Sequence, residues 1–160
     1  MRIALICVGR LKPGPERELF DRYFKRLKAA ARSVGVADVD MREIEESRAR
    51  RAEDRREEEA AAILEALAPQ EALVVLDERG ASPTSAAWAA DIARARDEGR
   101  SGYALVIGGP DGLSESLRAK AQAAISFGSM TWPHQLVRVM AGEQLYRALT
   151  ILSGHPYHRP

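Results

Sequence analysis

Apolar side chains recur along the chain with two different periods. In some segments they fall on one face of a helix, as over 16–32, and in others they form short continuous runs typical of buried parallel strands, as over 73–76. The pattern predicts helices over 16–32, 47–67, 82–96, from 114 onward, and 133–153. It predicts strands over 2–8, 34–44, 73–76, 103–107 and 124–127.

The predicted strands and helices alternate from one end of the chain to the other. Such alternation is typical of the α/β class, with a mostly parallel sheet that carries helices on both faces. The 160 residues contain no internal repeat and no linker-like stretch. We therefore expect a single domain over 1–160.

Charge and cysteine content narrow the class of protein. Lys and Arg number 24 against 23 Asp and Glu, so any contact with nucleic acid requires a local patch rather than bulk basicity. Cys7 is alone and forms neither an internal disulfide nor a structural zinc site, which predicts a reducing compartment, by default the cytoplasm. The apolar run 3–8 is too short for a signal peptide or a membrane span, so we expect no membrane association.

The segment from Arg42 to Glu59 is the most highly charged part of the chain. It holds six arginines and eight acidic residues. One interpretation is an arm that grips RNA, and the other is a solvated helix face crossed by ion pairs between residues four apart. We favour the solvated face, because runs of mixed charge usually have that role.

Unusual residues follow three of the predicted strands, at the edge where open parallel sheets bind ligands. They are LDERG at 76–80, IGGPDGL at 107–113 and SFGSMTWP at 126–133. Gly108 and Gly109 lack Cβ atoms and let the backbone approach a ligand, although Pro-Asp-Gly is also ordinary turn chemistry. The chain has neither the dinucleotide fingerprint nor a phosphate-binding loop, which disfavours a generic nucleotide fold.

The three histidines all lie near the carboxyl terminus, and two of them belong to the tail that follows Gly154. A metal site at His155 and His158 is disfavoured, because no cysteine and few acids are near to complete the ligand set. The tail also holds Tyr157 and Arg159, and an aromatic ring beside a guanidinium is what stacks on and holds an exposed nucleobase. An ordinary ordered terminus is the equal alternative.

Five ordered motifs closely resemble the ribosomal large subunit methyltransferase H family. They are LDERG at 76–80, IGGPDGL at 107–113, TWPH at 131–134, EQLYRA at 143–148 and HPYHR at 155–159. The family belongs to the SPOUT class, so the resemblance implies an α/β fold with a carboxyl-terminal trefoil knot, a homodimer, and S-adenosylmethionine as methyl donor without a metal. It places the donor at Leu76, Gly108, Phe127, Gly128, Ser129, Met130, Thr131 and Trp132. Gly128 stands where a serine is common in the family, and Trp132 where a smaller apolar residue is common.

The implied reaction is methylation of N3 of a pseudouridine in the large-subunit (23S) rRNA of the assembled 70S ribosome. The donor methyl is already electrophilic, so alignment is the main requirement, and a base helps because the imide nitrogen is protonated. We expect Tyr157 to position the target nucleobase or stack on it and His158 to act as the general base. Arg159 would stabilise charge on a phosphate or carbonyl oxygen. His134 is the second candidate base, with helix-start packing as its alternative.

Two other functions compete with this interpretation. The main rival is a non-catalytic ribosome-binding factor that keeps the fold, and donor binding discriminates between the two. A Ser-His hydrolase is disfavoured, because the chain has no G-x-S-x-G turn. In a dimer, the tail of one subunit is a candidate to complete the donor pocket of the other.

Overall fold

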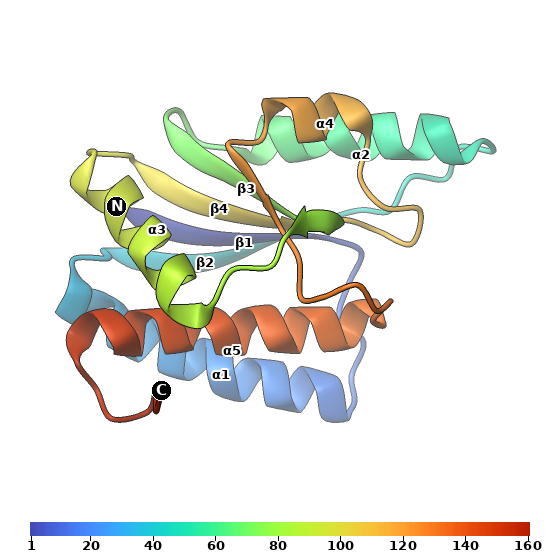
Figure 1. Cartoon of the computed structure of the whole chain (residues 1–160). Helices are drawn as coiled ribbons and strands as arrows, with labels where there is room; N and C mark the ends of the chain where they lie inside the picture. Colours follow the sequence, from blue (N-terminus) through green and yellow to red (C-terminus); the bar gives the residue numbers. More distant parts are fainter.

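The computed structural model, which describes residues 1–160, places five parallel strands in one sheet with the order β2-β1-β4-β3-β5 (Figure 1). The strands are β1 Arg2–Val8, β2 Asp38–Ile44, β3 Glu71–Ala81, β4 Gly102–Ile107 and β5 Ala123–Ile125. The helices are α1 Pro15–Ala31, α2 Ala52–Ala66, α3 Ser85–Asp97, α4 Glu115–Lys120 and α5 His134–Ser153. The predicted α/β class is confirmed.

Helices cover both faces of the sheet. Alternate residues of β1 point to opposite sides, so Leu5 belongs to a core cluster with residues of α1, α3 and α5, whereas Ile6 belongs to one with residues of α2 and α4. Figure 1 shows the same division, with α2 and α4 above the sheet and α1 and α5 below it. Burial on both faces explains why the central strands read as continuous apolar runs.

The second strand and the second helix start later than predicted. A short 3-10 helix over Arg32–Val34 ends at Gly35, whose φ of 76° turns the chain before β2 begins at Asp38. The second helix begins at Ala52 rather than at residue 47, and residues 45–51 connect it to β2. Periodicity did not reveal this boundary, because the segment has almost no apolar residues.

The third strand is longer than predicted. It continues through the LDERG motif to Ala81, because Ala81 pairs with Ile125 of β5 after a shift in register at Leu76. The next helix is capped by Thr84, whose hydroxyl accepts a hydrogen bond from the Ala87 amide, so the helix begins at Ser85 and not at residue 82 as predicted.

Two other helix starts agree closely with the prediction. Ser114 caps α4 by accepting a hydrogen bond from the Leu117 amide at 3.1 Å. Pro133 stands immediately before α5, at the N-cap. The last strand ends at Ile125, two residues earlier than predicted.

The edge strand β5 lies very close to the backbone of β3. A Cβ added to Gly80 would lie 2.6 Å from the carbonyl carbon of Ala124, and the Ser126 amide donates to the Ala81 carbonyl at 2.7 Å. Only glycine allows this approach. The trefoil knot stays a prediction.

The charged segment does not form the predicted pairs between residues four apart. Arg42 instead bridges Asp40 and Glu71, and Arg55 pairs with Asp111 of the loop after β4. Three of the six ion pairs of this segment join it to distant residues and none joins residues four apart, so this part of the prediction is wrong. None of the five helices has the length and apolar character needed to cross a membrane.

Candidate functional site

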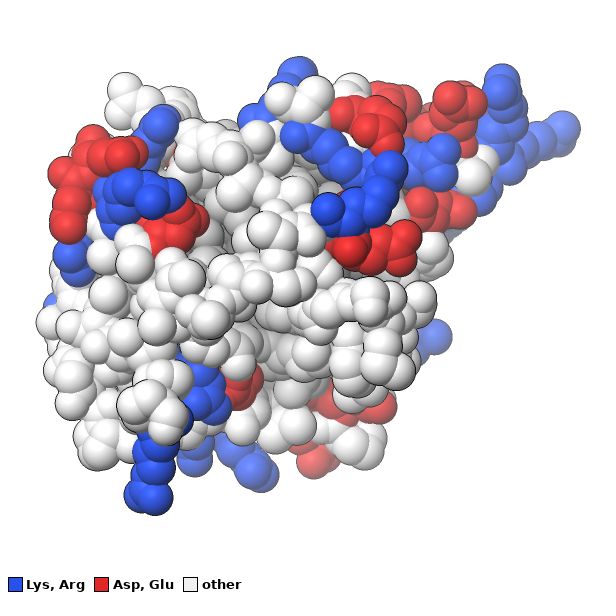
Figure 2. All heavy atoms as spheres, viewed as in Figure 1, with Lys and Arg blue, Asp and Glu red and all other residues white.

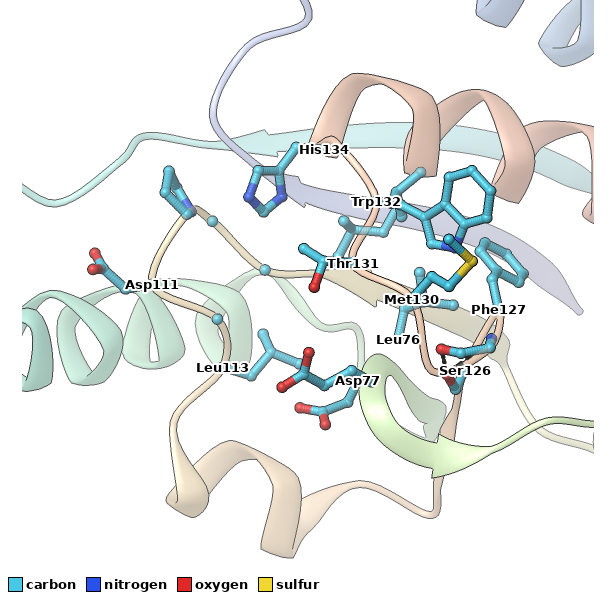
Figure 3. Close-up of a pocket in the computed structure, with 18 of the residues that line it drawn as sticks. Leu76, Asp77, Asp111, Leu113, Ser126, Phe127, Met130, Thr131, Trp132 and His134 are labelled. Carbon is cyan, nitrogen blue, oxygen red and sulfur yellow. Dashed lines mark hydrogen bonds between the residues drawn. The ribbon is translucent and has the colours of Figure 1, made fainter.

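A cavity of about 330 Å³ opens at the carboxyl ends of β3, β4 and β5 (Figure 3). The structure thus brings together the three segments that the sequence singled out. Every predicted donor-binding residue lines the cavity except Ser129, which is exposed. The lining also includes Asp77, Glu78, Ile107, Gly109, Pro110, Asp111, Gly112, Leu113, Arg118, Ser126, His134 and Val137.

The turn after β4 forms one wall of the cavity. Gly112 has a φ of 79°, and its amide donates to the Gly109 carbonyl at 3.0 Å, which closes the turn. A Cβ on Gly108 would lie 2.8 Å from Cδ2 of Leu113. Gly108 is therefore needed so that the turn can fold back onto Leu113.

The loop 127–132 forms the opposite wall. Gly128 has a φ of 110°, which explains glycine where the family commonly has serine. The Ser126 hydroxyl accepts from the Gly128 amide at 3.1 Å and donates to the Gly128 carbonyl at 2.8 Å, so the loop is held locally. Met130 is 72% exposed and Trp132 39% exposed. These large apolar side chains are thus open to a ligand or a partner.

The cavity has an apolar side and a polar side. In Figure 3, Phe127, Met130 and Trp132 lie at one end, whereas His134 and Asp111 lie at the other. The ring of Phe127 is held from behind by Trp88, with ring centroids 6.3 Å apart. A flat apolar group is accommodated at the first end and polar groups at the second.

Both aspartates of the cavity are paired with arginines. Asp77 is almost fully buried and accepts from Nε of Arg118 at 2.5 Å. Asp111 accepts two hydrogen bonds from Arg55, at 2.6 and 3.0 Å, and this guanidinium lowers the pKa of the Asp111 carboxyl. The pairs tie the cavity walls to α4 and to α2.

His134 lies at the mouth of the cavity. It is the first residue of α5, and its side chain is exposed and lines the polar side. Four residues later, Arg138 is buried and donates to the carbonyls of Val8 and Gly9 and to Glu43. This buried guanidinium fixes the start of α5 against the end of β1.

The tail lies away from the cavity of its own chain. None of Tyr157, His158 and Arg159 lines it. A helix of 20 residues such as α5 is about 30 Å long, and the tail follows its far end (Figure 1). One chain by itself therefore combines the predicted donor residues with His134 but not with the three residues of the tail.

The tail folds back along α5 and is anchored there. The Tyr157 hydroxyl donates to Oε1 of Glu143 at 2.9 Å, and Arg147 lies over the Tyr157 ring at 4.8 Å from its centroid. Burial and the bond to Glu143 raise the pKa of Tyr157. Glu143 and Arg147, one turn apart on α5, form an ion pair at 2.5 Å, and Nδ1 of His158 lies 3.5 Å from Arg147.

Sequence reasoning missed the residues that hold the cavity walls. Arg55 and Asp111 are 56 residues apart, and Asp77 and Arg118 are 41 apart, so no local pattern joins them. The one available indication of these ion pairs was a charged residue within a strand-end motif, such as Asp77. No group of three or more His, Cys, Asp or Glu side chains gathers where a metal ion would be held.

Comparison with known proteins shows similarity over the whole chain. A family model described as "Predicted SPOUT methyltransferase" matches residues 1–158. A curated protein of Bradyrhizobium diazoefficiens named Ribosomal RNA large subunit methyltransferase H is 58% identical over 159 residues, covering 99% of each chain. Proteins with the same name from Methylobacterium nodulans and Rhodopseudomonas palustris are 57% and 56% identical, over 99% of this chain and 98% and 99% of their own.

Proposed function

Because the chain belongs to the SPOUT methyltransferase family, we propose that it transfers a methyl group from S-adenosylmethionine to N3 of a pseudouridine in large-subunit rRNA. The proposed substrate is the assembled 70S ribosome, which places the reaction in the cytoplasm. The observation that carries the proposal is the convergence of three strand ends on one cavity. A catalytic role is favoured over a non-catalytic ribosome-binding factor, because a binding factor needs no such cavity.

The residues of the cavity fit the donor. A volume of about 330 Å³ lies in the range of small-molecule sites. Leu76, Phe127 and Met130 offer apolar surface for an adenine ring, and the turn at Gly108 lets backbone groups approach closely. The donor supplies an electrophilic methyl group when bound. The predicted set of Leu76, Gly108 and residues 127–132 is the proposed donor site, with Ser129 at its margin.

The acceptor base requires groups that orient it and remove its proton. His134 is the candidate base that already lines the cavity. Tyr157, His158 and Arg159 are the further candidates, and they reach the cavity only from a second copy of the chain. We therefore include a homodimer in the proposal, in which the tail of one subunit completes the pocket of its partner.

Two measurements test the proposed reaction. Calorimetry with S-adenosylmethionine tests the donor site, and mass spectrometry of large-subunit RNA after incubation with ribosomes and donor tests the product. We expect donor binding and one added methyl group at a pseudouridine. Absence of donor binding would favour the ribosome-binding factor instead.

Alanine variants test which histidine acts as the general base. His134→Ala and His158→Ala are compared for turnover, with Glu98→Ala, at an exposed side chain without a partner, as the control. We expect a large loss of kcat when the base is removed and near-normal kcat in the control. Near-normal turnover in His134→Ala, Tyr157→Ala, His158→Ala and Arg159→Ala would remove both the tail and His134 from the mechanism.

Mixed dimers test whether the tail acts across the interface. A subunit with a disabled pocket (Gly108→Trp) is mixed with a subunit with a disabled tail (His158→Ala). If the tail acts on the partner's pocket, random pairing recovers about a quarter of the wild-type activity. If each site is built from one chain, the mixture stays inactive.

A further inference from the structure

Three exposed arginines stand on the connection between β2 and α2. We call residues 45–51, with Arg48, Arg50 and Arg51, the arginine arm. The side chain of Arg48 is 92% exposed and that of Arg51 is 74% exposed. Figure 2 shows blue side chains projecting at the upper right, the end at which β2 and α2 are connected in Figure 1, with red side chains beside them.

The fold gives these arginines no stabilising role. Arg48 lies 3.7 Å from Glu45 and Arg51 lies 3.4 Å from Glu53, and such exposed pairs contribute little to stability. The side chain of Arg50 forms no hydrogen bond or ion pair. Arg51 stands at the N-cap of α2 without a capping hydrogen bond, where a positive charge opposes the helix dipole.

The arginine arm is nevertheless held in place by Arg55, which also binds Asp111 in the lining of the donor cavity. Nη1 of Arg55 donates to the carbonyls of Ala49 and Arg50, both at 3.0 Å. The same guanidinium holds Asp111 of the cavity with its other two nitrogens. One side chain therefore ties the arm to the polar side of the cavity, which His134, the proposed base, also lines.

We propose that the arginine arm docks on the phosphate backbone of the rRNA beside the target nucleotide. The proposal rests on the proposed function, because it takes rRNA as the partner. The net charge of the chain is only +1, and the segment 42–59 holds eight acidic residues against six arginines, so the contact depends on the exposed guanidinium groups of the arm and not on a net positive charge. Guanidinium groups bind phosphate with two hydrogen bonds, and exposed carboxylate partners are readily exchanged for it.

The test removes the three charges together. The variant Arg48→Gln/Arg50→Gln/Arg51→Gln is compared with a control that loses the same charge elsewhere, Arg2→Gln/Arg32→Gln/Arg94→Gln. The control residues are exposed and lie at the opposite end of the sheet. Methylation kinetics and co-sedimentation with ribosomes are measured from 50 to 200 mM salt, and donor Kd is measured by calorimetry.

In the arm variant we expect KM for ribosomes to rise about tenfold and the slope of log KM against log salt to fall by about 2. The donor Kd and kcat stay unchanged, as do all values for the control. A wild-type KM in the arm variant, or an equal rise in the control, would overturn the proposal. If wild-type protein binds ribosomes but adds no methyl group, the proposed function fails, and co-sedimentation still decides the role of the arm.

Discussion

Gly108→Ala places one added methyl group at the most crowded point of the cavity wall. The new Cβ would lie 2.8 Å from Cδ2 and 3.1 Å from Cγ of Leu113, and 3.2 Å from the carbonyl carbon of Gly112. Carbon atoms normally pack at about 3.5 to 4.0 Å, so Leu113 and the turn must shift. Overpacking of this kind costs about 1 to 3 kcal/mol of stability.

The shift also weakens the proposed donor site. Leu113 and Gly112 both line the cavity, so a ligand that needs their native position must restore it against the same energy. The expected increase in donor Kd is therefore about 5- to 150-fold. The expected fall in Tm is about 2 to 4 °C for each kcal/mol.

Calorimetry with S-adenosylmethionine and thermal unfolding check both values. Leu113→Ala is the partner variant, because it removes the two nearest atoms. In the double variant we expect a coupling energy of about 1 kcal/mol or more in donor binding. A wild-type donor Kd in Gly108→Ala, or a coupling below about 0.3 kcal/mol, would refute the reasoning.

Three further variants or reactions probe the fold. Gly80→Ala is expected to prevent stable folding, because its Cβ would lie 2.6 Å from the backbone of Ala124; wild-type stability in urea would contradict the close approach of β3 and β5. Burial raises the pKa of the Cys7 thiol to about 12, so iodoacetamide at pH 8 should label it only after unfolding, and rapid labelling of folded protein would contradict this. Arg138→Met should lower the free energy of unfolding by about 1 to 3 kcal/mol, because it removes the ion-pair partner of Glu43 and leaves the buried carbonyls of Val8 and Gly9 without their donor. A much smaller loss in chemical denaturation would show that this partner is not needed.

Local signals were sufficient for most of the fold. The apolar run of β1 and the helical spacing over α1 are properties of consecutive residues, and both elements occur within a residue of their predicted bounds. The start of α4 at Ser114 was also predictable from consecutive residues, because an N-cap hydrogen bond joins atoms only three residues apart.

Local sequence patterns gave the wrong secondary structure where contacts with distant segments decide the conformation. The apolar run predicts that the third strand ends at Leu76, yet β3 continues through LDERG, because β5 pairs with Ala81 at its end. Residues 47–51 were predicted to start a helix, yet they form a connection, because Arg55 donates to the carbonyls of Ala49 and Arg50 and Glu59 accepts from the Ser47 amide. Neither outcome can be inferred from the segment alone.

The sequence by itself determined the class of fold, the three strand ends that line the cavity and the motifs of the family, because each of these is carried by residues close together in the chain. Only the tertiary structure decided that Arg55 joins the arm to Asp111 across 56 residues, and that the tail folds onto α5 rather than into its own cavity. The physical reason is that an ion pair or a close backbone approach depends on separation in space. Local sequence patterns do not encode that separation.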